Sequence, residues 1–191
     1  MANISIFGQG NMGNAIGGLF QAAGHQVSFV KRGEANSQLG DIIVLAVPFA
    51  SVDGIIGQYA AQLAGKTVVD ITNPVNFDTM DGLLVSAGSS AAKYIATKLP
   101  QSRVLKAFNT NFAATLASRK VANKAKTTVL IAGDSDEAKQ QLVDALKGSG
   151  VYSKDAGSLK RARELEAFGF LAITLAVREQ IGWTGGFALF D

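Results

Sequence analysis

Short apolar runs alternate with longer stretches of helical spacing along the whole chain, and polar residues and glycines separate them. The pattern predicts strands at residues 4–7, 27–31, 42–47, 67–71, 104–108, 129–132 and around 151–152. It predicts helices at residues 11–23, 51–63, 89–99, 113–118 and 135–147, the last capped by Asp134. Strands joined by helices form a parallel sheet that is covered on both faces. We therefore expect an α/β fold with a doubly wound parallel sheet.

The connection after the second strand is unusually short. Only eight residues lie between Arg32 and Asp41, where a full nucleotide-binding half would place a helix, a strand and another crossover. The return to the next strand spans about 20 Å. Eight helical residues cover about 12 Å, whereas eight extended ones reach about 26 Å. We expect a largely extended link, with at most one helical turn near residues 36–39, and no third strand.

The C-terminal part reads as one long helix over residues 159–181, charged at first and apolar on nearly every side over residues 168–177. We therefore divide the chain into a dinucleotide-binding domain, residues 1–155, and a helical appendage, residues 156–191. An apolar helix with no partner leaves an exposed patch, which a two-fold symmetric pair would bury. This favours a homodimer; the alternative is that the aromatic tail folds back over the helix.

A glycine motif joins the first strand to the first helix: Gly8-Gln9-Gly10-Asn11-Met12-Gly13. In this context each glycine has a physical task, since the first permits a tight turn, the second admits a pyrophosphate and the third lets the helix pack closely. The helix N-terminus favours the diphosphate through its free N–H groups and its dipole. The motif indicates a bound dinucleotide; the alternative is a structural glycine turn.

The end of the second strand indicates which dinucleotide binds. The strand ends in Lys31-Arg32, and no acidic residue follows until Glu34. An acid here would bind the ribose 2′-hydroxyl of NAD, whereas basic residues suit the 2′-phosphate of NADP. The pattern favours NADP, although the two cations could also simply be solvated at a strand end.

Three later strands end in residues that can line the same crevice. These residues are Ala46-Val47-Pro48, Asn73-Pro74 and Asn109. In a doubly wound sheet, ligands bind outside the carboxyl ends of the strands, where the strand order reverses. The first three would support a nicotinamide ring and the asparagines would line the crevice. Alternatively, the proline ends a strand and the asparagines form turns.

Few residues are available for acid–base or metal chemistry. The only histidine, His25, falls in a turn at the opposite edge of the sheet, and the chain has no cysteine. No spacing of acidic residues suggests a metal site, so we expect none. The net charge is +3 with a sequence pI of about 9.2, but the basic residues are scattered, which argues against nucleic acid. No apolar run is long enough for a membrane span and no leader precedes the first strand, so we expect a cytoplasmic protein.

Two further motifs extend the pattern: Lys106-Ala107-Phe108-Asn109-Thr110, and the stretch over residues 155–166. Together with the segments above, they resemble the NADP oxidoreductases that depend on a deazaflavin, coenzyme F420; metalloreductase domains of the same superfamily share the pattern. The resemblance implies NADP across Gly8–Gly13, its 2′-phosphate near Lys31 and Arg32, and nicotinamide near Ala46–Pro48 and Asn73. It places a second redox carrier near Asn109 and the C-terminal region.

The leading interpretation is an NADPH-dependent oxidoreductase that passes hydride to a deazaflavin, a flavin or a similar planar acceptor. Such a reaction needs no acid or base from the protein, because the two cofactors supply the chemistry. The alternatives are an NADPH-binding sensor without catalysis and a reductase of ferric or other small substrates. A carbonyl or imine reductase is less favoured, since it would want a proton donor in the site.

Overall fold

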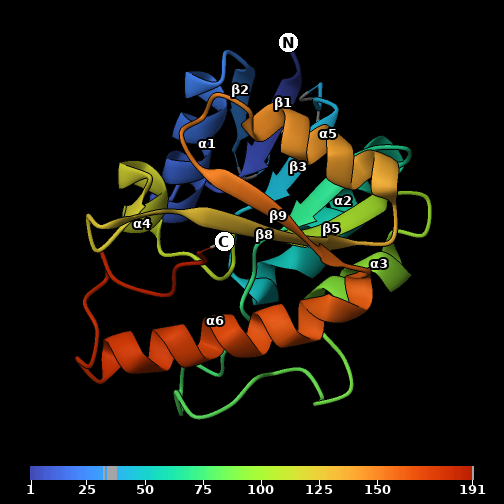
Figure 1. Ribbon diagram of the computed structural model, residues 1–191. Helices are drawn as coiled ribbons and strands as arrows, with labels where there is room; N and C mark the ends of the chain where they lie inside the picture. Colours follow the sequence, from blue (N-terminus) through green and yellow to red (C-terminus); the bar gives the residue numbers. More distant parts are fainter. Residues whose placement is uncertain (32, 34–37, 191) are drawn as a thin grey trace.

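The structure is a computed structural model that describes residues 1–31, 33 and 38–190. Within these residues the chain forms a seven-stranded sheet in the order β2-β1-β3-β4-β5-β8-β9 (Figure 1). Its strands are β1 (Asn3–Phe7), β2 (Gln26–Val30), β3 (Ile42–Leu45), β4 (Thr67–Asp70), β5 (Arg103–Ala107), β8 (Thr128–Gly133) and β9 (Tyr152–Gly157). The order reverses beside β1, since β2 lies on one side of it and β3 on the other. The doubly wound α/β class is confirmed.

The sheet is not parallel throughout, which corrects part of the prediction. Strands β1 to β5 pair in parallel, but β8 runs antiparallel to β5, and β9 is parallel to β8. The connection after β5 holds the short helix α4 (Ala113–Ser118) and a hairpin of β6 (Lys120–Val121) and β7 (Ala125–Lys126). A parallel return needs a crossover as long as the strands, and a six-residue helix covers only about 9 Å. The chain therefore enters the sheet from the opposite edge.

The expected absence of a third strand holds for the part of the chain that the structure describes. β1 pairs directly with β3, and none of Lys31, Gly33 and residues 38–41 belongs to a strand. The end of the link passes close to β1: the Gly40 N–H donates to Ser5 Oγ at 2.9 Å. A Cβ on Gly40 would overlap the backbone of Asn3, so only glycine fits there. Most of the helical turn expected near residues 36–39 lies outside the described residues.

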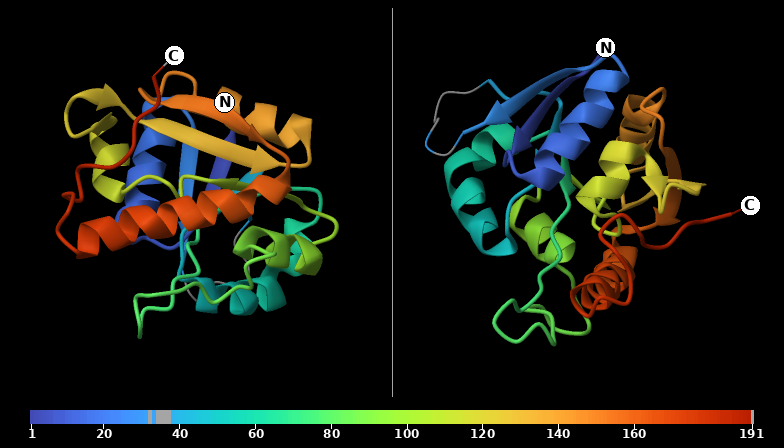
Figure 2. Two further views of the ribbon diagram at one scale, coloured as in Figure 1. Left: turned by 60° about the horizontal axis from the view of Figure 1, so that its bottom comes forward. Right: turned by 90° about the vertical axis from the view of Figure 1, so that its left-hand side faces the viewer.

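Helices cover the two faces of the sheet and form two cores (Figure 2). One core lies under α1 (Asn11–Ala22) and α5 (Asp136–Leu146), and the other under α2 (Val52–Leu63) and α3 (Ala91–Lys98). Side chains of a strand alternate between the two cores; in β3, for example, Ile42 and Val44 face one core while Ile43 and Leu45 face the other.

The last helix, α6 (Ala162–Val177), follows a single 3-10 turn, η2 (Leu159–Arg161), and lies across the sheet domain (Figure 1). It ends four residues before the predicted end at Ile181. The predicted cap of α5 is also wrong. Ser135 is the N-cap and accepts the Ala138 N–H, whereas Asp134 Oδ1 accepts the Leu159 N–H at 2.9 Å and so ties η2 to the end of β8. The division of the chain at residue 155 stays a prediction.

Candidate functional site

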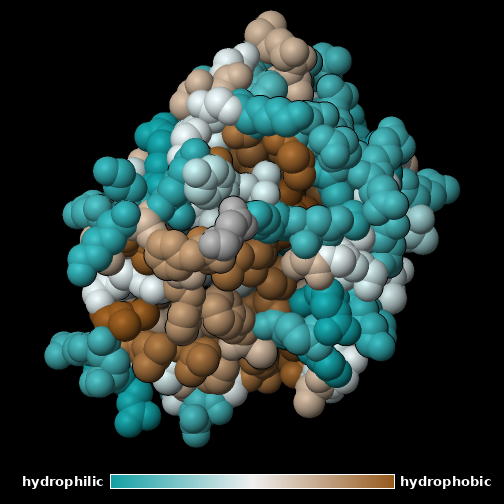
Figure 3. All heavy atoms as spheres, viewed as in Figure 1, coloured by the Kyte–Doolittle hydropathy of each residue, from teal (hydrophilic) through white to brown (hydrophobic). Residues whose placement is uncertain are grey.

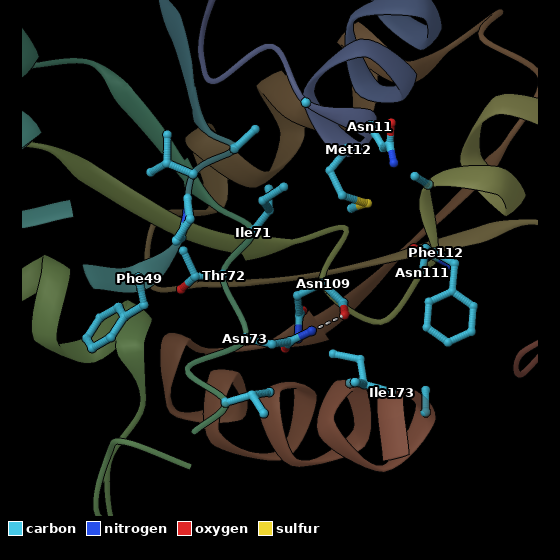
Figure 4. A pocket seen from close by; sticks show the side chains of 18 of the residues that line it. Asn11, Met12, Phe49, Ile71, Thr72, Asn73, Asn109, Asn111, Phe112 and Ile173 are labelled. Atoms are coloured by element: carbon cyan, nitrogen blue, oxygen red, sulfur yellow. Dashed lines mark hydrogen bonds between the residues drawn. The ribbon is translucent and has the colours of Figure 1, made fainter. Parts of the chain in front are cut away.

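A cavity of about 640 Å³ lies at the carboxyl ends of β1, β3, β4 and β5, which is the volume of a typical ligand pocket. Figure 4 shows Met12 of α1 on one side of it and Ile173 of α6 on the other, with Phe49 and Phe112 at its two ends. The predicted site residues that line it are Gly10, Asn11, Met12, Ala46, Val47, Pro48, Asn73 and Asn109. The crevice expected from the strand order is therefore present.

The glycine turn has two glycines that the fold requires and one that leaves space. Gly8 has a positive φ of 99°, and a Cβ there would overlap the carbonyl oxygen of Ala46. A Cβ on Gly13 would overlap the carbonyl oxygen of Gly8, so the start of α1 packs directly on the turn. A Cβ on Gly10 would have no atom within 4 Å. The backbone at Gly10 is therefore open to a ligand.

The N-terminus of α1 begins at this open position. Gly10 is the N-cap and its carbonyl accepts the Asn14 N–H at 2.9 Å, while Gln9 is exposed and its carbonyl accepts from Asn14 Nδ2. No side chain caps this end among the described residues. The first-turn N–H groups of a helix have no partner within the helix and attract anions. The residues present fit the pyrophosphate of a dinucleotide.

The floor of the pocket holds two interlocked asparagines from β4 and β5. Asn73 Nδ2 donates to the Asn109 carbonyl at 2.8 Å, and Asn109 Nδ2 donates to Asn73 Oδ1 and to the Leu165 carbonyl of α6, both at 2.8 Å. A Cβ on Gly169 would lie 2.6 Å from Asn73 Oδ1, so α6 must present a glycine where it crosses them. Pro74 is buried next to Asn73 and does not line the cavity. These contacts position α6 as a wall of the pocket.

Beneath this floor lies a buried cluster of charges that the sequence did not reveal. Lys106 Nζ lies 2.7 Å from Asp70 Oδ2 and 2.8 Å from Glu166 Oε1, and it also donates to the Thr72 carbonyl. Glu166 accepts the N–H groups of Ala91 and Ala92 at the start of α3. Burial raises the pKa of the Glu166 carboxyl, and Lys106 opposes that shift. The cluster connects β4, β5, α3 and α6 below the cavity.

Three buried oxygens on lining residues have no hydrogen-bond partner among the described residues: Thr72 Oγ1, Asn109 Oδ1 and Asn111 Oδ1. The orientation of Asn109 is fixed, because its Nδ2 already donates to two acceptors. A buried polar group without a partner costs about 1–3 kcal/mol, and such groups in native proteins usually have a reason. Their concentration around one cavity indicates a wall that is completed by a polar ligand.

Several lining residues were missed by the sequence reasoning. They are Phe49, Thr72, Thr110, Asn111, Phe112 and, from the C-terminal tail, Trp183. Most are neighbours of predicted residues, so extending each strand-end motif by a few positions would have found them. Trp183 is far along the chain and meets Phe112 with ring centroids 5.0 Å apart. No local signal predicts that contact.

The described lining residues include no acidic, basic, histidine or tyrosine side chain. His25 lies away from the cavity, where its Nδ1 accepts the Ala2 N–H at 3.0 Å, as its position in the sequence predicted. Among the described residues, His, Cys, Asp and Glu side chains form no group of three or more that could hold a metal ion. The pocket is therefore suited to binding uncharged rings.

The basic residues after β2 are only partly described. Lys31 is exposed and directly follows β2, whose last residue, Val30, pairs with Phe7 just before the glycine turn. Lys31 thus stands at the same edge of the sheet as the pocket. Arg32, the other predicted contact for a 2′-phosphate, lies outside the described residues.

Comparisons with known proteins agree with this geometry. The family described as NADP oxidoreductase coenzyme F420-dependent matches residues 34–74. An F420-dependent NADP reductase of Methanocaldococcus jannaschii is 31% identical over 150 residues, which cover 76% of this chain and 66% of that protein. The rat metalloreductase STEAP3 is 33% identical over 151 residues, covering 78% of this chain but 28% of that protein. The chain thus spans less than two thirds of the length of STEAP3 and just under two thirds of the archaeal relative.

A solved structure has the same fold over its whole length. A protein from Arthrobacter sp. FB24, described as a candidate F420-dependent NADP reductase, superimposes with a TM-score of 0.84 at 22% identity, with full coverage of both chains. At this identity the likeness concerns the fold alone. No helix among the described residues has the length and apolar character that crossing a membrane would require.

Proposed function

Because the chain belongs to the family of NADP oxidoreductases that depend on coenzyme F420, we propose that it is an enzyme that transfers hydride between NADP(H) and a planar redox acceptor, a deazaflavin or a flavin. The observation that carries the proposal is the pocket at the carboxyl ends of the strands. It begins at the open backbone of Gly10 and continues into a cavity without ionisable side chains.

The glycine turn and the start of α1 bind the pyrophosphate, with Gly10 leaving room and the N–H groups of the first turn donating. Ala46, Val47 and Pro48 follow β3 directly and form an apolar wall that supports the nicotinamide ring. Asn73 and Asn109 lie across the cavity from them, and the unpartnered Asn109 Oδ1 is available to a carboxamide N–H after a small movement of the wall. Lys31, with Arg32, contacts the 2′-phosphate.

The lack of ionisable lining residues determines which reactions fit. NADPH, when bound, supplies the hydride. A carbonyl or imine acceptor also needs a proton at the reacting centre, which a side chain would have to deliver. The protein has no such group among the described lining residues, so its part is to hold two planar rings together and exclude water. This favours a second carrier as the acceptor.

Steady-state oxidation of NADPH tests the proposal, with coenzyme F420, FMN, FAD and ferric chelates offered as separate acceptors. Turnover is expected with a deazaflavin or a flavin. NADPH binding without turnover on any of these acceptors would support the alternative, a sensor without catalysis. Turnover on ferric chelates alone, with no flavin added, would instead indicate a metal reductase. A cytoplasmic location stays a prediction.

The choice of NADPH over NADH has its own test. We expect NADPH to bind more tightly by about 1–3 kcal/mol, the range of charge-assisted contacts. Lys31→Glu places an acid at the end of β2, where it repels a 2′-phosphate and can accept a ribose hydroxyl instead. The variant should lose most of the preference in calorimetric titrations. Lys154→Glu is the matched control, since Lys154 lies in β9 away from the pocket. Equal affinity of the unmodified protein for both cofactors would contradict the proposal.

We also propose that two copies of the chain associate through α6. Figure 3 shows apolar side chains gathered over α6 and the tail. The tail does fold back, since Phe187 packs on Phe168 with ring centroids 4.5 Å apart, but it leaves Leu171 and Val177 about half exposed, at 49% and 48%. A symmetric pair would bury this surface.

Leu171→Glu should convert the dimer to a monomer without unfolding it, because Leu171 is half exposed in the single chain. Sedimentation equilibrium at micromolar concentration measures the change. Arg178→Glu, which also changes an exposed residue at the end of α6, is the control for added charge. A monomeric unmodified protein would rule the dimer out.

A further inference from the structure

The half of the pocket on the β5 side is left for the acceptor once the glycine turn and the residues after β3 are assigned to NADP(H). This half consists of the loop that follows β5, the start of α4, part of α6 and Trp183. Phe112 lies at this end of the cavity, opposite Phe49 (Figure 4). We propose that Phe112 and Trp183 form an aromatic wall that binds the flat ring of the acceptor and selects for it. The proposal rests on the proposed function and identifies specificity-determining residues for it.

The tail holds Trp183 in place through contacts on both sides of it. The Ala122 N–H, in the turn between β6 and β7, donates to the Thr184 carbonyl at 2.7 Å. The Gly185 N–H donates to the Gly182 carbonyl at 2.8 Å and closes a tight turn around Trp183. The contact of Phe187 with Phe168 then fastens the following residues to α6. The indole is therefore positioned by the fold and does not lie at the pocket by chance.

The geometry of the two rings leaves aromatic surface available to a ligand. Phe112 and Trp183 meet edge to face at an interplanar angle of 62°, and the Trp183 side chain remains 54% exposed. Aromatic faces bind planar heterocycles by stacking, with little dependence on substituents. The wall thus fits a flat ring system better than a branched or tetrahedral substrate.

The opposite rim of the pocket has the same character. Phe77 and Leu84, from the segment between β4 and α3, line the cavity and are 67% and 58% exposed. Exposed large apolar side chains on both rims of one cavity are unusual for a surface without a ligand. A planar ring that enters between the two rims would cover apolar surface on both of its sides.

The test compares Trp183→Ala with Trp183→Phe. Loss of a stacked ring lowers affinity about 5- to 150-fold. Trp183→Ala should therefore raise the KM for the acceptor, or the Kd for lumiflavin, within this range and leave the Kd for NADPH unchanged. Trp183→Phe should restore most of the affinity. Phe190→Ala removes an equally apolar tail residue that is 83% exposed and outside the pocket, so it should change neither constant.

A second readout does not depend on turnover. Trp183 is the only tryptophan of the chain, so its fluorescence reports this site alone. Titration with lumiflavin in the presence of NADP should quench it saturably. A Trp183→Ala variant with an unchanged acceptor constant, or one in which NADPH affinity falls equally, would overturn the proposal. If the unmodified protein reduces no acceptor, the proposed function fails; saturable quenching would still support the aromatic wall, and its absence would reject it.

Discussion

On the β1 side of the pocket the wall is backbone, whereas on the β5 side it is a network of side chains. Gly8 and Gly13 let the turn and the helix touch without any side chain between them. Across the cavity, the floor depends on Asn73 and Asn109, which rest on the charges of Lys106 and Glu166. The first wall lies within six consecutive residues, while the second joins residues 36 to 75 positions apart. A ligand site can thus combine one locally encoded wall with one that exists only after folding.

The largest effect is expected where the second wall is broken at its charges. Lys106→Met removes the cation and leaves Asp70 and Glu166 buried without compensation, which typically costs about 3–5 kcal/mol. Urea unfolding measures the loss. Lys93→Met, at an exposed lysine of α3, is the matched control and should stay within about 0.5 kcal/mol of the unmodified protein. A loss below about 1 kcal/mol for Lys106→Met would mean that the cluster does not hold the wall together.

The glycine wall should separate stability from binding. Gly13→Ala forces a Cβ against the Gly8 carbonyl and should lower the free energy of unfolding by about 1–3 kcal/mol. Gly10→Val extends into open space, so it should cost less than about 1 kcal/mol yet abolish NADPH binding. Thermal unfolding and calorimetric titration of both variants provide the comparison. Wild-type NADPH affinity in Gly10→Val would show that the diphosphate binds elsewhere.

The same contrast explains what could be predicted from the sequence. The glycine turn, the short link after β2 and the residues after β3 are local patterns, and the structure has them where expected. The charged cluster of Lys106 and Glu166 was not recognised, because a lysine inside an apolar strand gives no sign of its distant partners. Trp183 was missed for the same reason. The reversed direction of β8 depends on how far the six residues of α4 can carry the chain, which helical spacing alone does not show.

The smallest effect is expected at an exposed counterpart of the buried cluster. Asp155 Oδ2 lies 2.8 Å from Lys139 Nζ, and the lysine lowers the pKa of the Asp155 carboxyl. The Asp155 side chain is 55% exposed, so Asp155→Asn should cost less than about 1 kcal/mol. A lowered carboxyl pKa contributes stability above the unfolded pKa of about 3.9, and that stability is lost as the pH falls through the folded pKa. Urea unfolding of both proteins at several pH values should therefore converge in acid; a constant difference would contradict this origin.

The shortened connection after β2 also affects the edge of the sheet. Because no further strand is present among the described residues, β2 is the outermost strand, with backbone donors and acceptors on its outer side. Such an edge can recruit a strand of another molecule and start aggregation. β2 is only five residues long, exposes Gln26 and Ser28, and is followed directly by the exposed Lys31. Short length, polar positions and a lysine are devices that natural sheets use against such pairing, so Lys31 serves colloidal solubility as well as any phosphate it contacts.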